Sequence, residues 1–166
     1  MPGLISTEES KFIRKILIPI YESSEAHKAI LWYVNNLKLP GDLIIFLHVV
    51  EPILPSALSG LSSQYETMPC NAKYHVSEKI MNKAKLLCQE LVHEANIYGI
   101  KSEAMIQIDT KPGPAIIKMI NEQHIDNIIM LKRSLSFIKR AITGSVSSYV
   151  LHHSNIPVTI LSSMNN

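Results

Sequence analysis

The sequence predicts an α/β fold in which a parallel sheet is covered by helices on both faces. Short apolar runs alternate along the chain with longer segments whose apolar residues recur at helical spacing. Strands that alternate with helices are joined by right-handed crossovers, which make the strands parallel within one sheet. The apolar runs lie at residues 15–20, 43–50, 103–108, 127–130 and 157–161. We therefore expect a five-stranded parallel sheet with helices on both faces, which makes three layers, and the apolar pattern does not give the strand order.

Composition indicates a single globular domain over residues 1–166. Hydrophobic residues make up 46% of the chain and charged residues 18%, which is typical of a folded protein. The net charge of +2 is too small to indicate a nucleic-acid or membrane partner, and no apolar run approaches the roughly 20 residues that span a bilayer. Residues 1–11 lack the features of a signal peptide and are expected to be frayed. Cys70 and Cys88 lack CxxC spacing, which favours two reduced thiols in a cytoplasmic protein.

The first strand and helix are predicted from residue type and spacing. Residues 15–20 are β-branched and aliphatic, as in a strand that is buried on both faces. Pro19 would interrupt a central ladder, so we expect it at the end of this strand. Ser23 is a suitable N-cap for the following helix, whose apolar positions continue to Leu37 before Pro40–Gly41 ends it.

The second predicted strand, residues 43–50, contains His48. No second ligand lies at a suitable spacing, so a hydrogen-bonded structural histidine is favoured over a metal ligand. Residues 51–75 follow, and their prolines and serines predict a long loop. Loops of this length are usually functional lids or disordered segments, and the sequence leaves both alternatives open.

The second half of the chain continues the alternation of helices and strands. A long helix is predicted over residues 80–98, with Gly99 at the C′ position. After the third strand, Pro114 suits the first turn of a helix that ends near His124. A basic loop, residues 131–140, then follows the fourth strand.

The segment between the fourth and fifth strands contains a candidate anion site. Thr143-Gly-Ser-Val-Ser opens a helix that runs through His153. Ligands of open α/β sheets bind outside the carboxyl ends of the strands, and Gly144 and Ser145 lie where backbone N–H groups and the helix dipole would meet an anion. A tight turn with a Ser or Thr cap explains the same residues, and spacing alone favours the turn.

Several stretches together resemble the universal stress proteins. They are Ile16-Leu-Ile-Pro-Ile-Tyr-Glu-Ser-Ser-Glu, Phe46-Leu-His-Val-Val, Pro112-Gly-Pro-Ala-Ile-Ile, Asp126-Asn-Ile-Ile-Met and Thr143-Gly-Ser-Val-Ser-Ser-Tyr-Val-Leu-His-His-Ser-Asn-Ile-Pro-Val. The resemblance covers the chain from about Lys15 to Leu161, and its most specific part is the last stretch. It implies a three-layer, doubly wound sheet with the strand order 3-2-1-4-5, a dimer in most members, and in many members an adenine-nucleotide cleft between the first and fourth strands.

The family's phosphate loop is matched only in part. In the family it consists of Gly, two residues, Gly, nine residues, Gly, and then Ser or Thr. Gly144 and Ser145 match the last pair and are followed by Val146 and Ser147, whereas Leu131 stands at the first glycine and Ser134 at the second. Glycine permits left-handed backbone and a close approach to phosphate, so a leucine would obstruct the ligand in such a loop.

The resemblance also assigns residues to the base and ribose. Tyr21 stands where the family has an acidic residue for the ribose and adenine edge, so an acceptor for two hydroxyls is lost. Pro19 and Val49 match apolar wall positions. Positive charge beside Gly144 favours an anion, although a solvated loop accounts for it equally; it comes from Lys132, Arg133, Lys139 and Arg140. These matches and mismatches indicate an ATP or AMP site that is partly degraded.

Two functional hypotheses follow, from different classes. The first is a stress-response protein that senses adenine nucleotide, with slow ATP hydrolysis at most and no catalytic residue, because no nucleophile, carboxylate-pair or metal-site motif is present. The second is a dimeric interaction module that is independent of nucleotide. The resemblance implies pairing of the last strand with its copy, where Val158 and Ile160 would form the contact. Neither hypothesis requires a metal, nucleic acid or membrane.

Overall fold

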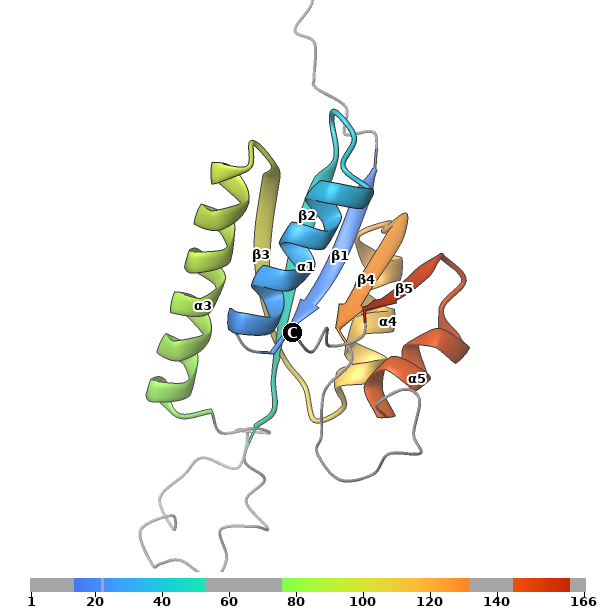
Figure 1. The fold of residues 1–166 in the computed structure, drawn as a ribbon. Coiled ribbons are helices and arrows are strands. Elements are labelled where there is room, and N and C mark those ends of the chain that lie inside the picture. Colours follow the sequence, from blue (N-terminus) through green and yellow to red (C-terminus); the bar gives the residue numbers. More distant parts are fainter. Residues whose placement is uncertain (1–13, 22, 53–75, 132–144, 162–166) are drawn as a thin grey trace, which may run out of the picture.

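The computed structural model describes residues 14–21, 23–52, 76–131 and 145–161. Its five strands form one parallel sheet in the order β3-β2-β1-β4-β5, which confirms the predicted fold class and strand order. The elements are β1 (Lys15–Ile20), α1 (Ser23–Asn36), β2 (Leu43–Val50), α3 (Glu78–Ile97), β3 (Lys101–Ile108), α4 (Pro112–Glu122), β4 (Asn127–Leu131), α5 (Ser145–His153) and β5 (Val158–Leu161). Figure 1 shows β3 and α3 at one side of the molecule and β5 with α5 at the other.

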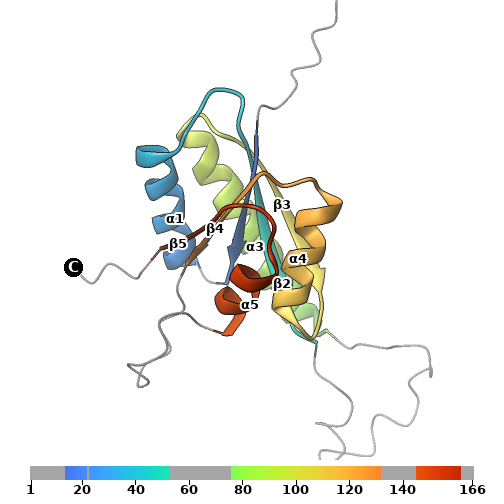
Figure 2. The same cartoon turned by 90° about the vertical axis from the view of Figure 1, so that its right-hand side faces the viewer.

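Helices cover both faces of the sheet (Figure 2), and each face has its own apolar cluster. The first cluster packs α1 and α3 on the sheet and includes Ile18, Phe46 and Leu91. The second packs α4 and α5 on the opposite face and includes Leu17 and Ile116. Neighbouring residues of β1 thus enter different clusters, because successive side chains of a strand point to opposite faces.

The ends of α3 and α4 share one backbone arrangement. After α3, Ile100 N–H donates to the Ala95 carbonyl at 3.0 Å while Gly99 adopts φ 63°, which is the Schellman arrangement expected of a C′ glycine. After α4, Ile125 N–H donates to the Ile120 carbonyl at 3.0 Å. Here His124 occupies the C′ position with φ 52°, although a side chain disfavours that conformation.

Several predicted boundaries differ from the structure by one or two residues. β3 begins at Lys101 rather than at residue 103, because an edge strand tolerates the polar residues that concealed its start. β4 extends through Leu131, so the prediction that the loop begins at this residue is wrong. α4 begins at Pro112, which keeps Pro114 in the first turn as predicted. α1 begins at Ser23, so Ser23 is its first helical residue rather than the residue before it.

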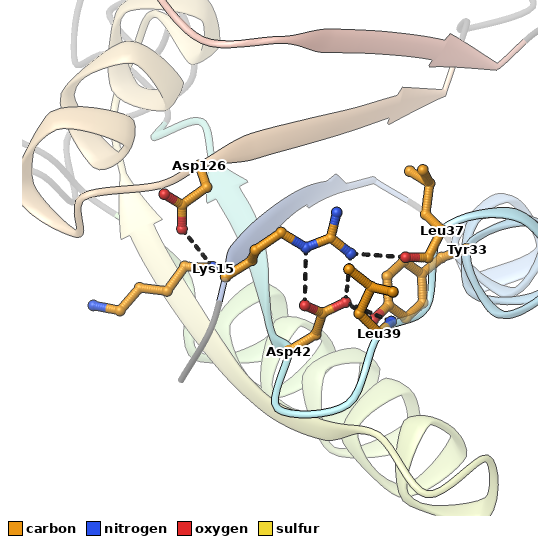
Figure 3. A network of polar contacts seen from close by, with 7 residues as sticks. Lys15, Tyr33, Leu37, Leu39, Asp42 and Asp126 are labelled. Atoms are coloured by element: carbon orange, nitrogen blue, oxygen red, sulfur yellow. Dashed lines mark hydrogen bonds and ion pairs between the residues drawn. The ribbon is translucent and has the colours of Figure 1, made fainter. Parts of the chain in front are cut away.

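A buried carboxylate organises the amino edge of the sheet, where Asp42 directly precedes β2. Asp42 Oδ1 accepts from Arg14 Nε at 3.0 Å, and Oδ2 accepts from Arg14 Nη2 at 2.7 Å, the Tyr33 hydroxyl at 2.6 Å and the Leu39 N–H at 2.9 Å (Figure 3). Burial alone would raise the pKa of Asp42, but these hydrogen bonds outweigh it and hold the pKa below its usual value. Burial and the adjacent carboxylate raise the pKa of Tyr33, so Tyr33 remains a neutral hydrogen-bond donor.

Asp126 forms a second contact at the same edge, directly before β4. Its Oδ2 accepts from the Lys15 N–H at 2.7 Å, and its own N–H donates to the Lys15 carbonyl at 2.9 Å. Lys15 Nζ reaches the Gln123 carbonyl at 3.0 Å. The starts of β1 and β4 are therefore joined to each other and to the end of α4.

Some expectations concern residues outside the described ranges. These are the frayed residues 1–11, the loop over 53–75 and Cys70. Cys88 is buried on α3 in the first cluster, and burial raises the pKa of its thiol. Among the described residues, no helix is long and apolar enough to span a membrane.

Candidate functional site

The carboxyl edge of the sheet contains the point where the strand order reverses. The chain proceeds from β1 outward to β2 and β3, and then returns to the other side of β1 through β4 and β5. The crossovers on the two sides of β1 lie on opposite faces, α1 with α3 and α4 with α5. In open α/β sheets, ligands bind at the carboxyl ends of the two strands that flank this reversal, which here are β1 and β4.

The pairing between β1 and β4 is confined to the beginnings of the two strands. Its register joins Ile16 to Asn127 and Leu17 to Ile128. By contrast, β1 pairs with β2 along its whole length, from Lys15 with Leu43 to Ile20 with His48. The carboxyl halves of β1 and β4 are therefore neighbours without a common ladder, and this is where the order of the sheet reverses.

Pro19 and Val49 lie on this edge of the sheet. Pro19 is buried as the penultimate residue of β1, which confirms its expected place at the strand end, and it is in register with Leu47. The registered pairs between β1 and β4 end before Pro19, which suits a residue that has no N–H to donate. Val49 is buried in the cluster of α4 and α5. Both side chains are apolar, as the resemblance implies for a wall of the site.

Tyr21 is the first residue after β1 and is half-buried. It therefore lies at the carboxyl edge, where the resemblance places contacts to ribose and base. A phenol has one O–H donor and an oxygen that accepts, whereas a carboxylate at this position would accept from two ribose hydroxyls. The Tyr21 hydroxyl oxygen is buried, so this residue offers a ligand less hydrogen-bonding capacity than a carboxylate would.

Leu131 is the last residue of β4, in register with Leu161 of β5. Its side chain is 7% exposed and belongs to the cluster under α1 and α3, together with Ile129. The sequence predicted an obstructing side chain in a loop, but the structure places this side chain in the core. Leu131 is still the last residue of β4, at the carboxyl edge of the sheet. The effect of this residue on nucleotide affinity stays a prediction.

α5 begins at the same edge, because it connects the parallel strands β4 and β5. Ser145 is exposed at its first position, Val146 packs against the cluster of α4 and α5, and Ser147 is buried with 4% exposure. The N–H groups of the first helical turn have no partner within the helix, so together with the helix dipole they favour an anion. Ser134, Gly144 and the four basic residues lie outside the described ranges.

The position of α5 is fixed by close packing against α4. A Cβ atom on Gly113 would lie 2.7 Å from the Tyr149 ring, so the two helices approach more closely than any side chain at residue 113 would allow. The Tyr149 ring also stacks on His153, with ring centroids 3.9 Å apart. This contact was not predicted from the sequence, because the only local feature of Gly113 is its place between two prolines.

His48 has the structural role that was predicted for it. Its Nδ1 lies 3.0 Å from the Ile20 carbonyl, so the imidazole joins the ends of β1 and β2 as a donor from that nitrogen. Over the described ranges, no group of three or more His, Cys, Asp or Glu side chains could hold a metal ion.

The fold defines a doubly wound α/β protein whose strand order reverses between β1 and β4. The family model of the universal stress protein family matches residues 13–162, and the chain belongs to this family. Universal stress protein MJ0577 of Methanocaldococcus jannaschii is 27% identical over 166 residues, which cover 94% of this chain and 99% of the relative.

Solved structures of the family share the fold. The structure of MJ0577 superposes with a TM-score of 0.70 at 23% identity, covering 93% of this chain and 99% of the other. The universal stress protein of Archaeoglobus fulgidus in complex with dAMP gives 0.62 at 16% identity, over 90% and 98% of the two chains. A family member from Arabidopsis thaliana with AMP bound gives 0.60 at 16% identity, over 90% and 91%.

Proposed function

We propose that this protein binds an adenine nucleotide at the carboxyl edge between β1 and β4 and acts in the stress response without catalysing a reaction. Its ligand is ATP or AMP, bound more weakly than by a family member with the full glycine loop. Structures of two relatives contain dAMP and AMP. The proposed role is that of a cytoplasmic sensor whose bound nucleotide biases its contacts with other proteins.

The observation that carries this proposal is the separation of β1 and β4 toward their carboxyl ends, at the same edge of the sheet where α5 begins. The registered pairs end at Leu17 and Ile128, which leaves the carboxyl halves of both strands without a shared ladder at the reversal of strand order. The start of α5 supports a phosphate site, because the dipole of a helix favours an anion at its N-terminus. Pro19 and Val49 support an apolar wall, because both lie near the carboxyl ends of their strands.

Two differences from the family explain the weak binding that we propose. Tyr21 replaces the acidic residue that would bind the ribose, and Leu131 and Ser134 replace two glycines of the phosphate loop. Tyr21 offers at most one donor and one acceptor where a carboxylate would accept from two hydroxyls. Each unmade hydrogen bond to a charged acceptor forfeits about 1.5–3 kcal/mol, which corresponds to roughly a ten- to hundredfold loss of affinity.

Calorimetric titration of the purified protein with AMP and ATP, and with GMP as the base control, tests the proposal. We expect binding of AMP or ATP, weaker or undetectable binding of GMP, and loss of binding in Gly144→Val, which places a branched side chain at the start of α5. Asn155→Val is the matched control, because Asn155 is exposed beyond the other end of α5. Absence of binding of any adenine nucleotide by the wild type would contradict the proposal.

A nucleotide-independent dimeric module is the second candidate, and the exposure of β5 favours it. All four residues of β5 are half-buried, and β5 is an edge strand with a neighbour on one side only. Val158 and Ile160 lie on one face of this edge, in register with Ile128 and Met130. Unpaired backbone groups on such an edge are suited to pairing with a second copy.

Light scattering at micromolar concentration distinguishes the two candidates. A dimer that forms equally with and without AMP, in protein that binds no nucleotide, supports the interaction module. A dimer whose stability changes with AMP supports the sensor. Ile160→Lys places a charge in the expected contact and should shift either dimer toward monomer, and a monomeric wild type would remove β5 pairing from both models.

A further inference from the structure

The outer face of α3 carries the two most exposed large apolar side chains among the described residues. Leu86 is 66% exposed and Ile97 is 69% exposed. Single exposed apolar residues are common on protein surfaces, so exposure alone shows little. However, Leu86, Glu90, His93 and Ile97 follow one another at steps of four, three and four, which aligns them in one stripe along the helix.

This stripe is self-complementary about one point. Leu86 and Ile97 lie three turns apart, or ~16 Å along the axis, and Glu90 and His93 lie between them. Both pairs share the same midpoint, between residues 91 and 92. A second copy of α3 in antiparallel orientation about a two-fold axis through this midpoint would therefore place Leu86 against Ile97 and Glu90 against His93.

We propose that the outer face of α3 is an interaction surface for the same face of a second copy of this chain. In this pairing, each apolar contact joins Leu86 of one copy to Ile97 of the other, and the exposed side chains remove each other from water. The Glu90 carboxylate accepts a hydrogen bond from the imidazole N–H of the other copy, which the neutral and the charged ring both donate. The same two interactions occur twice, as an isologous contact requires.

The place of α3 in the fold gives this surface a distinct consequence. α3 packs over β3 and β2, at the opposite side of the sheet from β5 (Figure 1). A molecule with two different isologous contacts assembles beyond the dimer, into a closed tetramer or an open chain according to the geometry of the two axes. A single helix pair buries less surface than a standard stable interface, so we expect this contact to dissociate with a Kd between about 10 μM and 1 mM.

Sedimentation equilibrium from 10 μM to 1 mM tests the proposal in the Ile160→Lys background, which removes pairing through β5 and requires no nucleotide. We expect reversible dimers in this background, weakened at least tenfold by Leu86→Glu or Ile97→Glu. Leu151→Glu is the matched control on α5, where Leu151 is 47% exposed, and it should leave association unchanged. All three positions are exposed, and circular dichroism verifies that each variant is folded.

A charge exchange tests the register of the contact. His93→Glu opposes two carboxylates and should weaken association, while the double variant Glu90→Lys with His93→Glu restores an opposite pair and should recover it. The proposal is overturned by a monomer at 1 mM, by equal effects of Leu86→Glu and Leu151→Glu, or by a double variant that associates no better than His93→Glu. Failure of nucleotide binding has no bearing on these outcomes.

Discussion

The two edges of the sheet use polar groups in different ways. At the amino edge, a polar network surrounds one carboxylate: Asp42 receives four hydrogen bonds from Arg14, Tyr33 and Leu39. At the carboxyl edge, the strands β1 and β4 share no registered pairs beyond Leu17 and Ile128, and α5 begins there. The amino edge thus contains the polar network, and the carboxyl edge contains the helix N-terminus where we propose that an anion binds.

The polar network that stabilises the fold and the proposed ligand site therefore lie at opposite ends of the strands. The core clusters extend to both edges, as Leu131 shows at the carboxyl edge, but the dense polar network lies at the amino edge. A substitution in that network should therefore change the free energy of unfolding while leaving ligand affinity intact. Substitutions at the carboxyl edge test whether ligand affinity can change while the free energy of unfolding stays the same.

The largest expected effect comes from Asp42→Ala. Removal of the carboxylate leaves the buried Tyr33 hydroxyl unpaired and leaves Arg14 with its hydrogen bond to the Leu37 carbonyl. Because Arg14 is 26% exposed, we expect a cost of about 3 kcal/mol, at the lower end for breaking a buried pair. Urea unfolding measures the loss, and AMP affinity of the folded variant should be unchanged. Asp126→Ala, at an exposed carboxylate on the same edge, is the control and should cost about 1 kcal/mol.

The sign of the pH dependence follows from the lowered pKa of Asp42. Its stabilising contribution is fully present above the unfolded pKa of about 3.9 and is lost as the pH falls through the lower folded pKa. The stability difference between wild type and Asp42→Ala should therefore shrink in this acidic range. A difference that stays constant to pH 2 would show that packing, rather than charge, accounts for the effect.

Leu131→Ala tests the carboxyl edge and should cost about 2–4 kcal/mol, as for other buried leucines. A loss below about 1 kcal/mol in urea unfolding would mean that residue 131 behaves as a loop residue, contrary to its burial. Leu161→Ala is the matched control, because Leu161 is its half-buried partner in β5 and should cost less.

A glycine at residue 131 tests whether the leucine there weakens nucleotide binding. Because the Leu131 side chain lies in the core, the expected gain comes from the backbone, which glycine frees for a close approach to phosphate. We expect Leu131→Gly to strengthen AMP or ATP affinity by roughly ten- to a hundredfold, on the order of 1–3 kcal/mol, and Ser134→Gly to add to it. The titration must use conditions in which the destabilised variant is folded. Tight binding by the wild type that Leu131→Gly does not improve would show that the leucine does not limit the site.

The sequence predicted the positions of helices and strands better than it predicted the contacts between them. The apolar periodicity located all five strands, because side-chain alternation follows from backbone geometry, and the family resemblance supplied their order. The end of β4 was predicted one residue early, since Leu131 adjoins two basic residues that suggested a loop. The short β1–β4 ladder and the contact of Gly113 with Tyr149 depend on tertiary packing, which no local pattern of residues encodes.

The smallest expected effect concerns the two helix ends at the amino edge. His124 holds the left-handed C′ position of α4 that Gly99 holds after α3, and a side chain there carries strain that glycine avoids. His124→Gly should therefore stabilise the protein by about 0.5–1 kcal/mol, since relief of strain exceeds the greater flexibility of the unfolded chain. Gly99→Ala is the reciprocal variant and should cost about 1 kcal/mol. Thermal unfolding that shows no gain in stability for His124→Gly would contradict this expectation. It would mean that contacts of the His124 side chain compensate for the strain of its backbone.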